Sequence, residues 1–337
     1  MKGKLEYVWP AVGLAAVVFS CWLLWRELHA VSMADIKASL AAIRPHEYML
    51  AGFSTLVAYA ALAWYDRIAL LHLGVRHISW TFISLCSFTT YALSHNIGAS
   101  VFSGAMVRYR AYSTQGLSAG QVAVLVAICS FTFGLGTILL GGVVLTFEPN
   151  QLARLSGLLP AFLTNPTTAR LIGLALLAFV ALYVVGSVLH FRPLAIGTFK
   201  IEYPRPPVTF RQLIAAPAEL LGAAGIIYFA LPEAGNPGYF VVLAVFLASF
   251  SAALASHAPG GLGVFEIIFL TAMPDIPKAQ VLAALLVFRL FYLLLPLLFA
   301  LVVVVMFERA RLAKLWRELH AVSMADIKAS LAAIRPH

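Results

Sequence analysis

The feature that most constrains this chain is a set of long segments that carry no charge. The longest runs from Ala111 to Phe147, 37 residues without Lys, Arg, Asp or Glu. A helix needs ~20 mostly apolar residues to cross a bilayer. Charged residues make up only 11% of the chain, against about 25% in soluble domains. This pattern excludes a water-soluble globular domain, a disordered chain and a nucleic-acid-binding domain, although the formal net charge is +9.

Six segments are long and apolar enough to be full membrane spans, so we expect an all-α, polytopic integral membrane protein. The first follows a basic N-terminus and lacks a small-residue cleavage site, which indicates a retained span and not a signal peptide. The fifth contains Glu219, and the last contains Arg289 and Pro296. The six spans are Tyr7–Trp25, Tyr48–Tyr65, Ser118–Phe147, Leu171–Leu189, Gln212–Pro232 and Ala279–Phe307.

Two further apolar regions are too long for one span. Ile78–Val107 is broken by His95-Asn96-Ile97-Gly98, and Ala234–Asp275 is broken by the polar, glycine-rich run from Ser256 to Gly263. Breaks of this kind are tolerated at membrane depth only where protein buries them or where they line a cavity. We therefore expect two re-entrant helical hairpins, with two short full spans in each region as the alternative.

Lys and Arg divide the loops between two sides of the membrane, since loops rich in these residues stay in the cytoplasm. With six spans and two hairpins, both termini are expected in the cytoplasm of a bacterial inner membrane, and the hairpins enter from opposite faces. That is typical of an inverted repeat, which in transporters has its binding site near the bilayer midplane. The basic loops are Met1–Leu5, those at Arg76 and at Arg108/Arg110, His190–Arg211 and Arg309–Lys314; the poorly basic ones are Glu148–Thr168, Glu233–Gly238 and Asp275–Lys278.

All of these elements belong to one expected membrane domain, residues 1–314. It comprises a first span with an interfacial helix (1–46), a first repeat (47–147), a connecting span (148–208) and a second repeat (209–314). Residues 315–337 are identical to residues 24–46. Diverged repeats do not stay identical, and the predicted topology puts the two copies on opposite sides. We interpret 315–337 as a recent duplication or an appended segment, with a functional terminal helix as the alternative. Either copy has the pattern of a short amphipathic helix at an interface.

Signatures of enzymes and metal sites are missing from the sequence. Cys21, Cys86 and Cys129 lie far apart in apolar runs, and we interpret them as small packing residues. No set of His, Cys, Asp and Glu has the spacing of a zinc site. P-loop, HExxH and GxSxG motifs are absent as well. We therefore expect a transporter and not an enzyme, with no metal, no cofactor and no catalytic residue.

Ionisable side chains inside apolar segments are the candidates for function, because each costs at least ~2.5 kcal/mol on insertion scales. Several allow a purely structural interpretation. Glu219 and Arg289 could form a buried ion pair, Asp66 and Arg67 could mark an interface, and the histidines of the two breaks could bond the interrupted backbone. The candidate substrate-binding residues are Asp66, Asn96, Arg108, Arg110, Glu219, His257, Gly260, Gly261, Glu266 and Arg289.

Movement of an anionic lipid headgroup is the chemistry that these residues favour. Arg108 and Arg110 follow the first predicted hairpin, and the planar fork of arginine binds phosphate in a bidentate manner. They could also be ordinary positive-inside residues. Half-helix N-termini in 96–104 and 260–265 would offer N–H donors to phosphate oxygens. A cationic headgroup would require the carboxylates as well.

Two segments carry a family resemblance. His257-Ala-Pro-Gly-Gly-Leu-Gly-Val-Phe-Glu266 resembles the hallmark of the lysylphosphatidylglycerol synthase transmembrane-region family, which includes the membrane half of the multiple peptide resistance factor. The Asn-Ile-Gly, Ser-Gly, Arg-Tyr-Arg and Tyr-Ser elements within Ser94–Ser113 are similar to its second signature. The resemblance covers roughly residues 7–312. His95 departs from it, since family members usually have Asn there.

The resemblance implies a flippase that moves aminoacylated phosphatidylglycerol, such as the lysyl form, between leaflets. It matches the family's important positions to Asp66, Arg108/Arg110, Glu219 and Glu266. No soluble transferase domain follows Lys314, so synthase activity is not expected. The alternatives are a non-catalytic scaffold for a lipid-modifying enzyme and a transporter of a hopanoid, glycolipid or polyprenyl phosphate. Expected partners are membrane phospholipid, a second copy of the chain and a separate aminoacyl-transferase or lipid-synthesis enzyme, with no nucleic acid.

Overall fold

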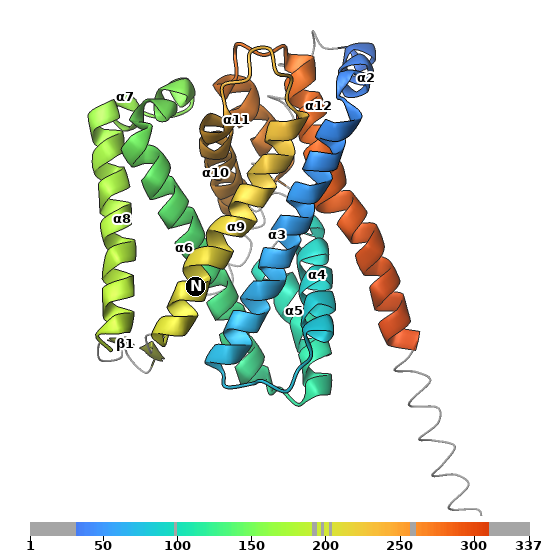
Figure 1. Ribbon diagram of the computed structural model, residues 1–337, viewed down its shortest axis with the longest axis vertical. Helices are drawn as coiled ribbons and strands as arrows, with labels where there is room; N and C mark the ends of the chain where they lie inside the picture. Colours follow the sequence, from blue (N-terminus) through green and yellow to red (C-terminus); the bar gives the residue numbers. More distant parts are fainter. Residues whose placement is uncertain are drawn as a thin grey trace, which may run out of the picture.

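The structure of this chain is a computed structural model that describes residues 32–97, 100–190, 194–196, 199–201, 204–256 and 261–309. Several predictions lie outside these residues: the first span Tyr7–Trp25, the candidates His257 and Gly260, and the repeated segment 315–337. The described residues form a bundle of long helices (Figure 1).

The expected helical class is confirmed for the described residues, with one small exception. The helices are α2 (Met33–Ala42), α3 (Pro45–His72), α4 (Trp80–Ile97), α5 (Ser100–Tyr112), α6 (Ala119–Phe147), α7 (Ala161–Thr164), α8 (Pro166–Val188), α9 (Pro206–Ala230), α10 (Tyr239–Ser256), α11 (Val264–Ala272) and α12 (Lys278–Phe288), with the short turns η1 (Ser113–Gln115), η2 (Pro149–Leu155) and η4 (Arg289–Leu294). The exception is an antiparallel ribbon of β1 (Leu194–Ile196) and β2 (Phe199–Ile201).

Six helices in the described part of the chain are long and apolar enough to cross a membrane. Five coincide with predicted spans: α3, α6, α8, α9 and the continuous helix of residues 278–309. The sixth is α10, which the sequence had assigned to the first arm of the second broken region. Its 18 residues extend about 27 Å, so length alone does not distinguish a span from a hairpin arm.

Helix starts follow local sequence signals. The predicted N-cap at Ser118 is confirmed: its hydroxyl accepts the Gln121 N–H at 3.3 Å, and the Gln121 side chain accepts the Ser118 N–H at 2.9 Å. The short helix predicted in the first copy of the repeat is α2, whose N-cap Ser32 forms the same reciprocal pair with Asp35. Reciprocal caps satisfy backbone donors that a helix start would otherwise leave free.

The loops gather at two opposite ends of the molecule, as predicted from the Lys/Arg bias. In Figure 1 the α3–α4 and α5–α6 connections and the β-ribbon lie at the lower end, where His77 contacts the Gln115 carbonyl at 3.2 Å. The α9–α10 and α11–α12 connections lie at the upper end. There Arg154 lies 3.9 Å from Asp275. Among the described residues, the basic loops at Arg76 and near Arg110 are therefore at the lower end, and the poorly basic loops are at the upper end.

Arg44 also belongs to the upper end. Its guanidinium pairs with Glu47 at 2.7 Å and with Glu233, and these bonds raise the pKa of Arg44 above its usual value. Both pairs are exposed, so they orient the start of α3 more than they stabilise the fold.

The two broken regions form two helix pairs that approach the centre of the bundle from opposite ends. Helix α4 begins and α5 ends at the lower end of the molecule (Figure 1). Helix α10 begins and α11 ends at the upper end. The α4 and α5 helices pack against each other, as do α10 and α11. The inner ends of both pairs therefore lie well inside the bundle.

The most extensive helix contact joins α3 to α9, the first helices of the two predicted repeats. Small residues allow this approach: a Cβ atom on Gly222 would lie 2.8 Å from the Ser54 carbonyl oxygen and 2.9 Å from the Ala58 nitrogen. Close approach through small residues is how helices associate in membranes, where no water drives apolar surfaces together.

Pro296, which lies within the last predicted span, does not end the helix and lies just after the π-helical turn η4. Proline has no N–H to donate to the carbonyl four residues earlier, which here is that of Tyr292. The Tyr59 hydroxyl donates to this carbonyl instead, at 2.9 Å. The neighbouring Leu293 carbonyl accepts from the Asn96 amide at 3.1 Å. The proline thus lets α3 and α4 bond directly to the backbone of the last helix.

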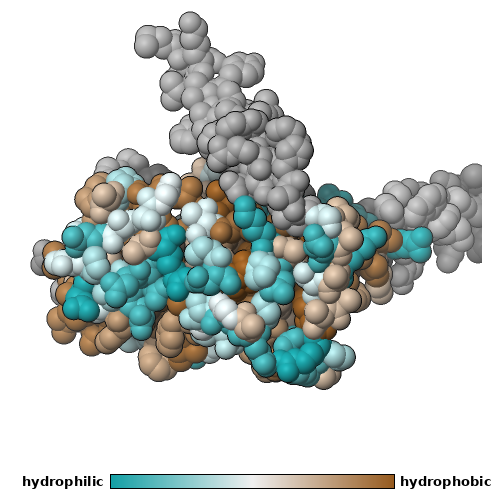
Figure 2. Space-filling model, turned by 90° about the horizontal axis from the view of Figure 1, so that it is seen from above, coloured by the Kyte–Doolittle hydropathy of each residue, from teal (hydrophilic) through white to brown (hydrophobic). Residues whose placement is uncertain are grey.

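Large apolar side chains are exposed around the flanks of the bundle, among them Phe53, Leu171, Leu182 and Phe299. The end face in Figure 2 differs, since hydrophilic residues gather on it and hydrophobic residues surround them. Apolar flanks with polar ends are the surface of a protein that lies in a bilayer.

Candidate functional site

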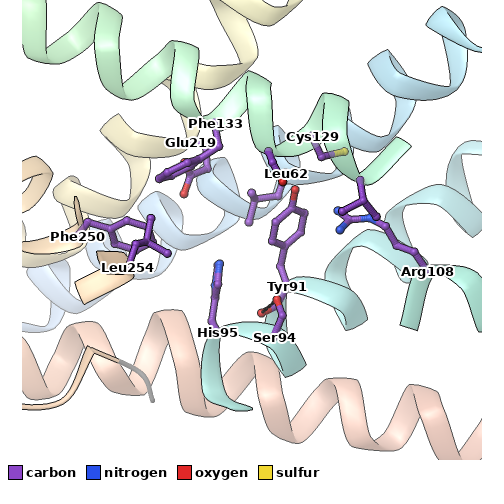
Figure 3. A pocket seen from close by; sticks show the side chains of 12 residues that line it. Leu62, Tyr91, Ser94, His95, Arg108, Cys129, Phe133, Glu219, Phe250 and Leu254 are labelled. Carbon is purple, nitrogen blue, oxygen red and sulfur yellow. Dashed lines mark hydrogen bonds between the residues drawn. The ribbon is translucent and has the colours of Figure 1, made fainter. Parts of the chain in front are cut away.

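A cavity of about 130 Å³ lies between α3, α4, α5, α6, α9 and α10. Its polar and aromatic lining comes from Tyr91, Ser94 and His95 of α4, Arg108 of α5, Cys129, Ser130 and Phe133 of α6, Glu219 of α9 and Phe250 of α10 (Figure 3). Residues from both predicted repeats therefore meet at one place. Of the predicted site residues, Arg108 and Glu219 line it directly.

Arg108 and Asp66 form a buried ion pair beside the cavity. The Nη2 group of Arg108 donates to Oδ1 of Asp66 at 2.7 Å, and its Nε group lies 3.2 and 3.3 Å from the two carboxylate oxygens. The Tyr112 hydroxyl donates to Oδ2 at 2.9 Å. The side chains are 5% and 0% exposed. The carboxylate of Asp66 is therefore fully buried inside the protein, with Arg108 and Tyr112 as its partners.

One terminal nitrogen of the Arg108 guanidinium, Nη1, does not bond to Asp66. Its guanidinium carbon lies 4.8 Å from the centre of the Tyr91 ring, in a cation–π arrangement. Nε and Nη2 bond to Asp66, and Nη1 makes no hydrogen bond to any of the described residues. Figure 3 shows the guanidinium reaching toward the cavity. Asp66 and Tyr91 thus fix the position of the Arg108 guanidinium, and its Nη1 group can still donate a hydrogen bond to a ligand.

Glu219 belongs to a second polar group on the other side of the cavity. Its Oε1 atom accepts a hydrogen bond from the Tyr292 hydroxyl at 2.7 Å, and the residue is 1% exposed. Its Oε2 atom is buried without a hydrogen-bond partner in the described part of the chain. The carboxylate therefore has no cationic partner there.

His95 lies between aromatic rings at the inner end of α4. Its ring stacks on Tyr292 at a centroid distance of 5.4 Å and packs against Tyr91 and Phe250. The Nδ1 atom is buried and makes no hydrogen bond with the described residues. The expectation that this histidine bonds the interrupted backbone is not met by Nδ1. Asn96 does so instead, donating to the Ala92 and Leu293 carbonyls at 2.7 and 3.1 Å.

Arg289 pairs with Glu266 and not with Glu219, so the predicted Glu219–Arg289 pair is wrong. Its Nη2 and Nε groups lie 2.5 and 2.9 Å from Oε1 of Glu266. The other oxygen, Oε2, accepts the Gly263 N–H at 2.7 Å and so caps α11. A single sequence does not show which carboxylate lies beside a given arginine in the folded protein, and the prediction failed for that reason. Glu266 and Arg289 join α11 to the last helix.

Arg110 lies apart from the cavity although it is two residues from Arg108. Both arginines are in the last turns of α5 and not in a loop after it. Arg110 is 59% exposed and donates from Nε to Glu308 at 2.6 Å, which ties α5 to the end of the last helix. Since 3.6 residues make one turn, two residues place side chains on opposite faces of a helix. Arg110 is thus a surface residue at the lower end.

Gly261 occupies a position that suits only glycine. Its φ of 63° lies in the left-handed region, and a Cβ atom would lie 2.9 Å from both Ala253 and the Phe265 ring. The residue therefore closes the turn between α10 and α11, in keeping with the predicted break. Its two neighbours in the candidate list, His257 and Gly260, lie outside the described residues.

The tyrosines of the site were not among the residues predicted from the sequence. Four of them lie in apolar helices: Tyr59, Tyr91, Tyr112 and Tyr292. A buried tyrosine needs a hydrogen-bond partner for its hydroxyl, and this requirement could have marked them as candidate site residues. Cys129 is likewise more than a packing residue, since its Sγ lies 3.5 Å from Oδ1 of Asp66. Among the described residues no group of His, Cys, Asp and Glu could hold a metal ion.

Known proteins resemble the chain along most of its length. It matches no protein-family model. It is 32% identical over 302 residues to the uncharacterized protein slr0712 of Synechocystis, an alignment that covers 87% of this chain and 90% of the relative. It is 30% identical over 255 residues to the inner membrane protein YbhN of Escherichia coli, covering 75% of this chain and 77% of that protein.

Proposed function

Since the chain belongs to the family of inner membrane protein YbhN and is itself a multi-pass bacterial inner-membrane protein, we propose that it is a lipid flippase. Its substrate in this proposal is an anionic or aminoacylated phospholipid of the lysylphosphatidylglycerol type, moved between leaflets. The proposal includes membership of the lysylphosphatidylglycerol synthase transmembrane-region family, on the strength of the two sequence signatures. It assigns the chain no catalytic activity.

The observation that carries this function is Arg108 in the central cavity. A phosphate that crosses a bilayer must exchange its hydration for fixed donors, because unsatisfied charge in hydrocarbon is very costly. Arg108 is buried and held by Asp66 and Tyr91, with Nη1 left for a phosphate oxygen. Charge-assisted N–H to phosphate bonds are about twice as strong as neutral ones. The lipid tails would stay in the bilayer while the headgroup uses the cavity.

A re-entrant arrangement of the two helix pairs supports alternate access to this cavity. The α4–α5 and α10–α11 pairs approach from opposite ends, as two halves of an inverted repeat would. Each second arm is fastened by an ion pair, Asp66–Arg108 for α5 and Glu266–Arg289 for α11. Broken helices that meet near the bilayer midplane are typical of transporter binding sites. Arg110 at the lower rim would meet headgroups that arrive from the cytoplasmic leaflet.

Sidedness is tested by single cysteines at Thr114 and Pro277 in a cysteine-free background. Both positions are exposed, Thr114 at the lower end and Pro277 at the upper end. The positive-inside rule places the lower end in the cytoplasm. An impermeant thiol reagent should label Pro277→Cys from outside intact cells and Thr114→Cys only after the membrane is opened. Labelling of both from one side would contradict the inverted repeat.

Flipping is tested in proteoliposomes with acyl-labelled phosphatidylglycerol and with its lysyl form. A reductant added outside bleaches the outer leaflet, so the loss of the protected fraction reports movement. We expect bleaching of the inner pool in protein-containing vesicles and not in protein-free ones. A chain that flips neither lipid, yet co-purifies with a lipid-modifying enzyme, would instead be the scaffold considered above.

A further inference from the structure

Among the described charged side chains around the cavity, Glu219 is the one that lacks a partner of opposite charge. Arg108 is paired with Asp66, and Arg289 is paired with Glu266. Glu219 is as deeply buried as Asp66, at 1% exposed, and none of the described cations pairs with it. An ionised carboxylate without a cation is very costly in a dry interior, and such a group takes up a proton instead.

Glu219 and Arg108 line the same cavity. Glu219 lines the cavity, Oε2 is the atom without a partner in the described chain, and the Tyr292 hydroxyl holds the other oxygen. Figure 3 shows the carboxylate and the His95 ring both directed into the cavity. The Nδ1 atom of His95 is also buried without a partner among the described residues. Two proton acceptors therefore stand beside the arginine.

A phosphate and an ionised Glu219 would repel each other in this small, weakly screened space. The positive charge of Arg108 does not compensate for both the phosphate and an ionised Glu219, because the Asp66 carboxylate already neutralises it. An anionic headgroup that enters the cavity thus requires Glu219 to be neutral. An ionised carboxylate becomes neutral only by binding a proton, which Glu219 takes from the side to which the cavity is open.

We propose that Glu219 is the coupling site of a proton–lipid symporter, so that one proton crosses the membrane with each singly charged anionic lipid. The proton binds Oε2 from solution on one side and returns to solution on the other, with His95 as the neighbouring acceptor on its route. This inference rests on the proposed flippase function. Because one positive and one negative charge move together, the step is electroneutral: a pH gradient drives it and a membrane potential does not.

The other groups that face Glu219 do not replace it in this role. The ring hydroxyls around it remain neutral near pH 7, the arginine is paired, and the described part of α10 contributes only apolar side chains to the cavity. Among the described residues, the ionisable groups that line the cavity or lie beside Glu219 are Tyr59 and Tyr65 of α3, Tyr91 and His95 of α4, Arg108 of α5 with its partner Asp66 of α3, Cys129 of α6, and Tyr292 of η4.

The test uses proteoliposomes with acyl-labelled phosphatidylglycerol and an imposed pH difference, with the voltage clamped by potassium and valinomycin. At steady state the label should concentrate in the leaflet that faces the more alkaline solution, by up to tenfold per pH unit, since one pH unit is a tenfold ratio of protons. Changing the voltage alone should not move it. Protein-free vesicles give the slow background.

The Glu219→Gln variant mimics the neutral acid but carries no proton. We expect it to flip lipid without response to the pH difference and to respond to voltage instead, because the lipid now moves as a net charge. Glu219→Asp keeps an ionisable group and should keep the response to pH, and the exposed Glu148→Gln should behave as the unmodified protein. Infrared spectra should contain a protonated-carboxyl band that Glu219→Gln loses and Glu148→Gln retains.

The outcomes separate the two proposals. Flipping by the unmodified protein that ignores the pH difference, or a protonated-carboxyl band that survives in Glu219→Gln, overturns the proton coupling and leaves the flippase standing. No flipping above the protein-free background at any pH contradicts the proposed function, and the coupling with it. If Glu219→Gln does not fold, the response of Glu219→Asp and the infrared band of the unmodified protein decide.

Discussion

Replacing Asp66 by Asn should lower the free energy of unfolding by about 3–5 kcal/mol, because it leaves the Arg108 guanidinium buried without a counter-ion. The pair is almost fully buried, at 0% and 5% exposed, and three Arg108–Asp66 contacts lie between 2.7 and 3.3 Å. Arg108→Gln should also destabilise the protein, although the Tyr112 hydroxyl still bonds to Asp66. Unfolding in detergent by a graded denaturant measures both.

The double variant Asp66→Asn/Arg108→Gln should recover most of that loss. It removes both charges together, and two neutral amides can replace the pair, so no charge is left without a partner. Arg170→Gln, a change at an exposed position of α8, is the matched control and should alter nothing measurable. Single effects that simply add in the double variant would show that the two side chains do not stabilise each other.

Glu266 and Arg289 give the second large effect. Removing either partner should destabilise the protein, and the double variant Glu266→Gln/Arg289→Gln should reveal a coupling of about 2 kcal/mol, a typical value for residues in one ion-pair network. The contacts at 2.5 and 2.9 Å support it. Glu266 also accepts the Gly263 N–H at the start of α11. Gln can keep this bond and Ala cannot, so Glu266→Ala should be more harmful than Glu266→Gln.

A cycle between Glu219→Gln and Arg289→Gln is the matched comparison. The two side chains are not hydrogen-bonded in the structure, where Glu219 bonds to Tyr292 instead, so their effects on stability should be close to additive. A coupling as large as that of Glu266 with Arg289 would restore the pairing expected from the sequence. It would also contradict the charge balance from which the role of Glu219 is inferred.

The long elements could be predicted from the sequence because their cause is local. Long stretches with few or no charged residues predicted α3, α6, α8, α9 and the last helix. The start of a helix depended on residues within one turn, as at Ser118. The breaks near Asn96 and Gly261 were also visible, since polar and glycine residues have few uses at that depth. The distribution of Lys and Arg then indicated which loops share an end.

The partners inside the bundle could not be predicted in the same way. Glu219, Glu266 and Arg289 are each isolated in an apolar run, and pairing them depends on the rotation of three helices about their own axes. The bond from Tyr59 to the Tyr292 carbonyl depends on Pro296, which acts four residues away along another helix. Contacts of that kind exist only after the helices have packed.

The measurement that tests the central claim most directly is lipid flipping by the Asp66→Asn/Arg108→Gln double variant. Because both charges are removed, the protein should remain folded, while the cavity loses its donor for the phosphate. The proteoliposome assay with acyl-labelled phosphatidylglycerol should therefore give a rate at the protein-free background, and Arg170→Gln should flip as the unmodified protein does. A folded double variant that flips at the unmodified rate would show that Arg108 does not carry the headgroup across the membrane.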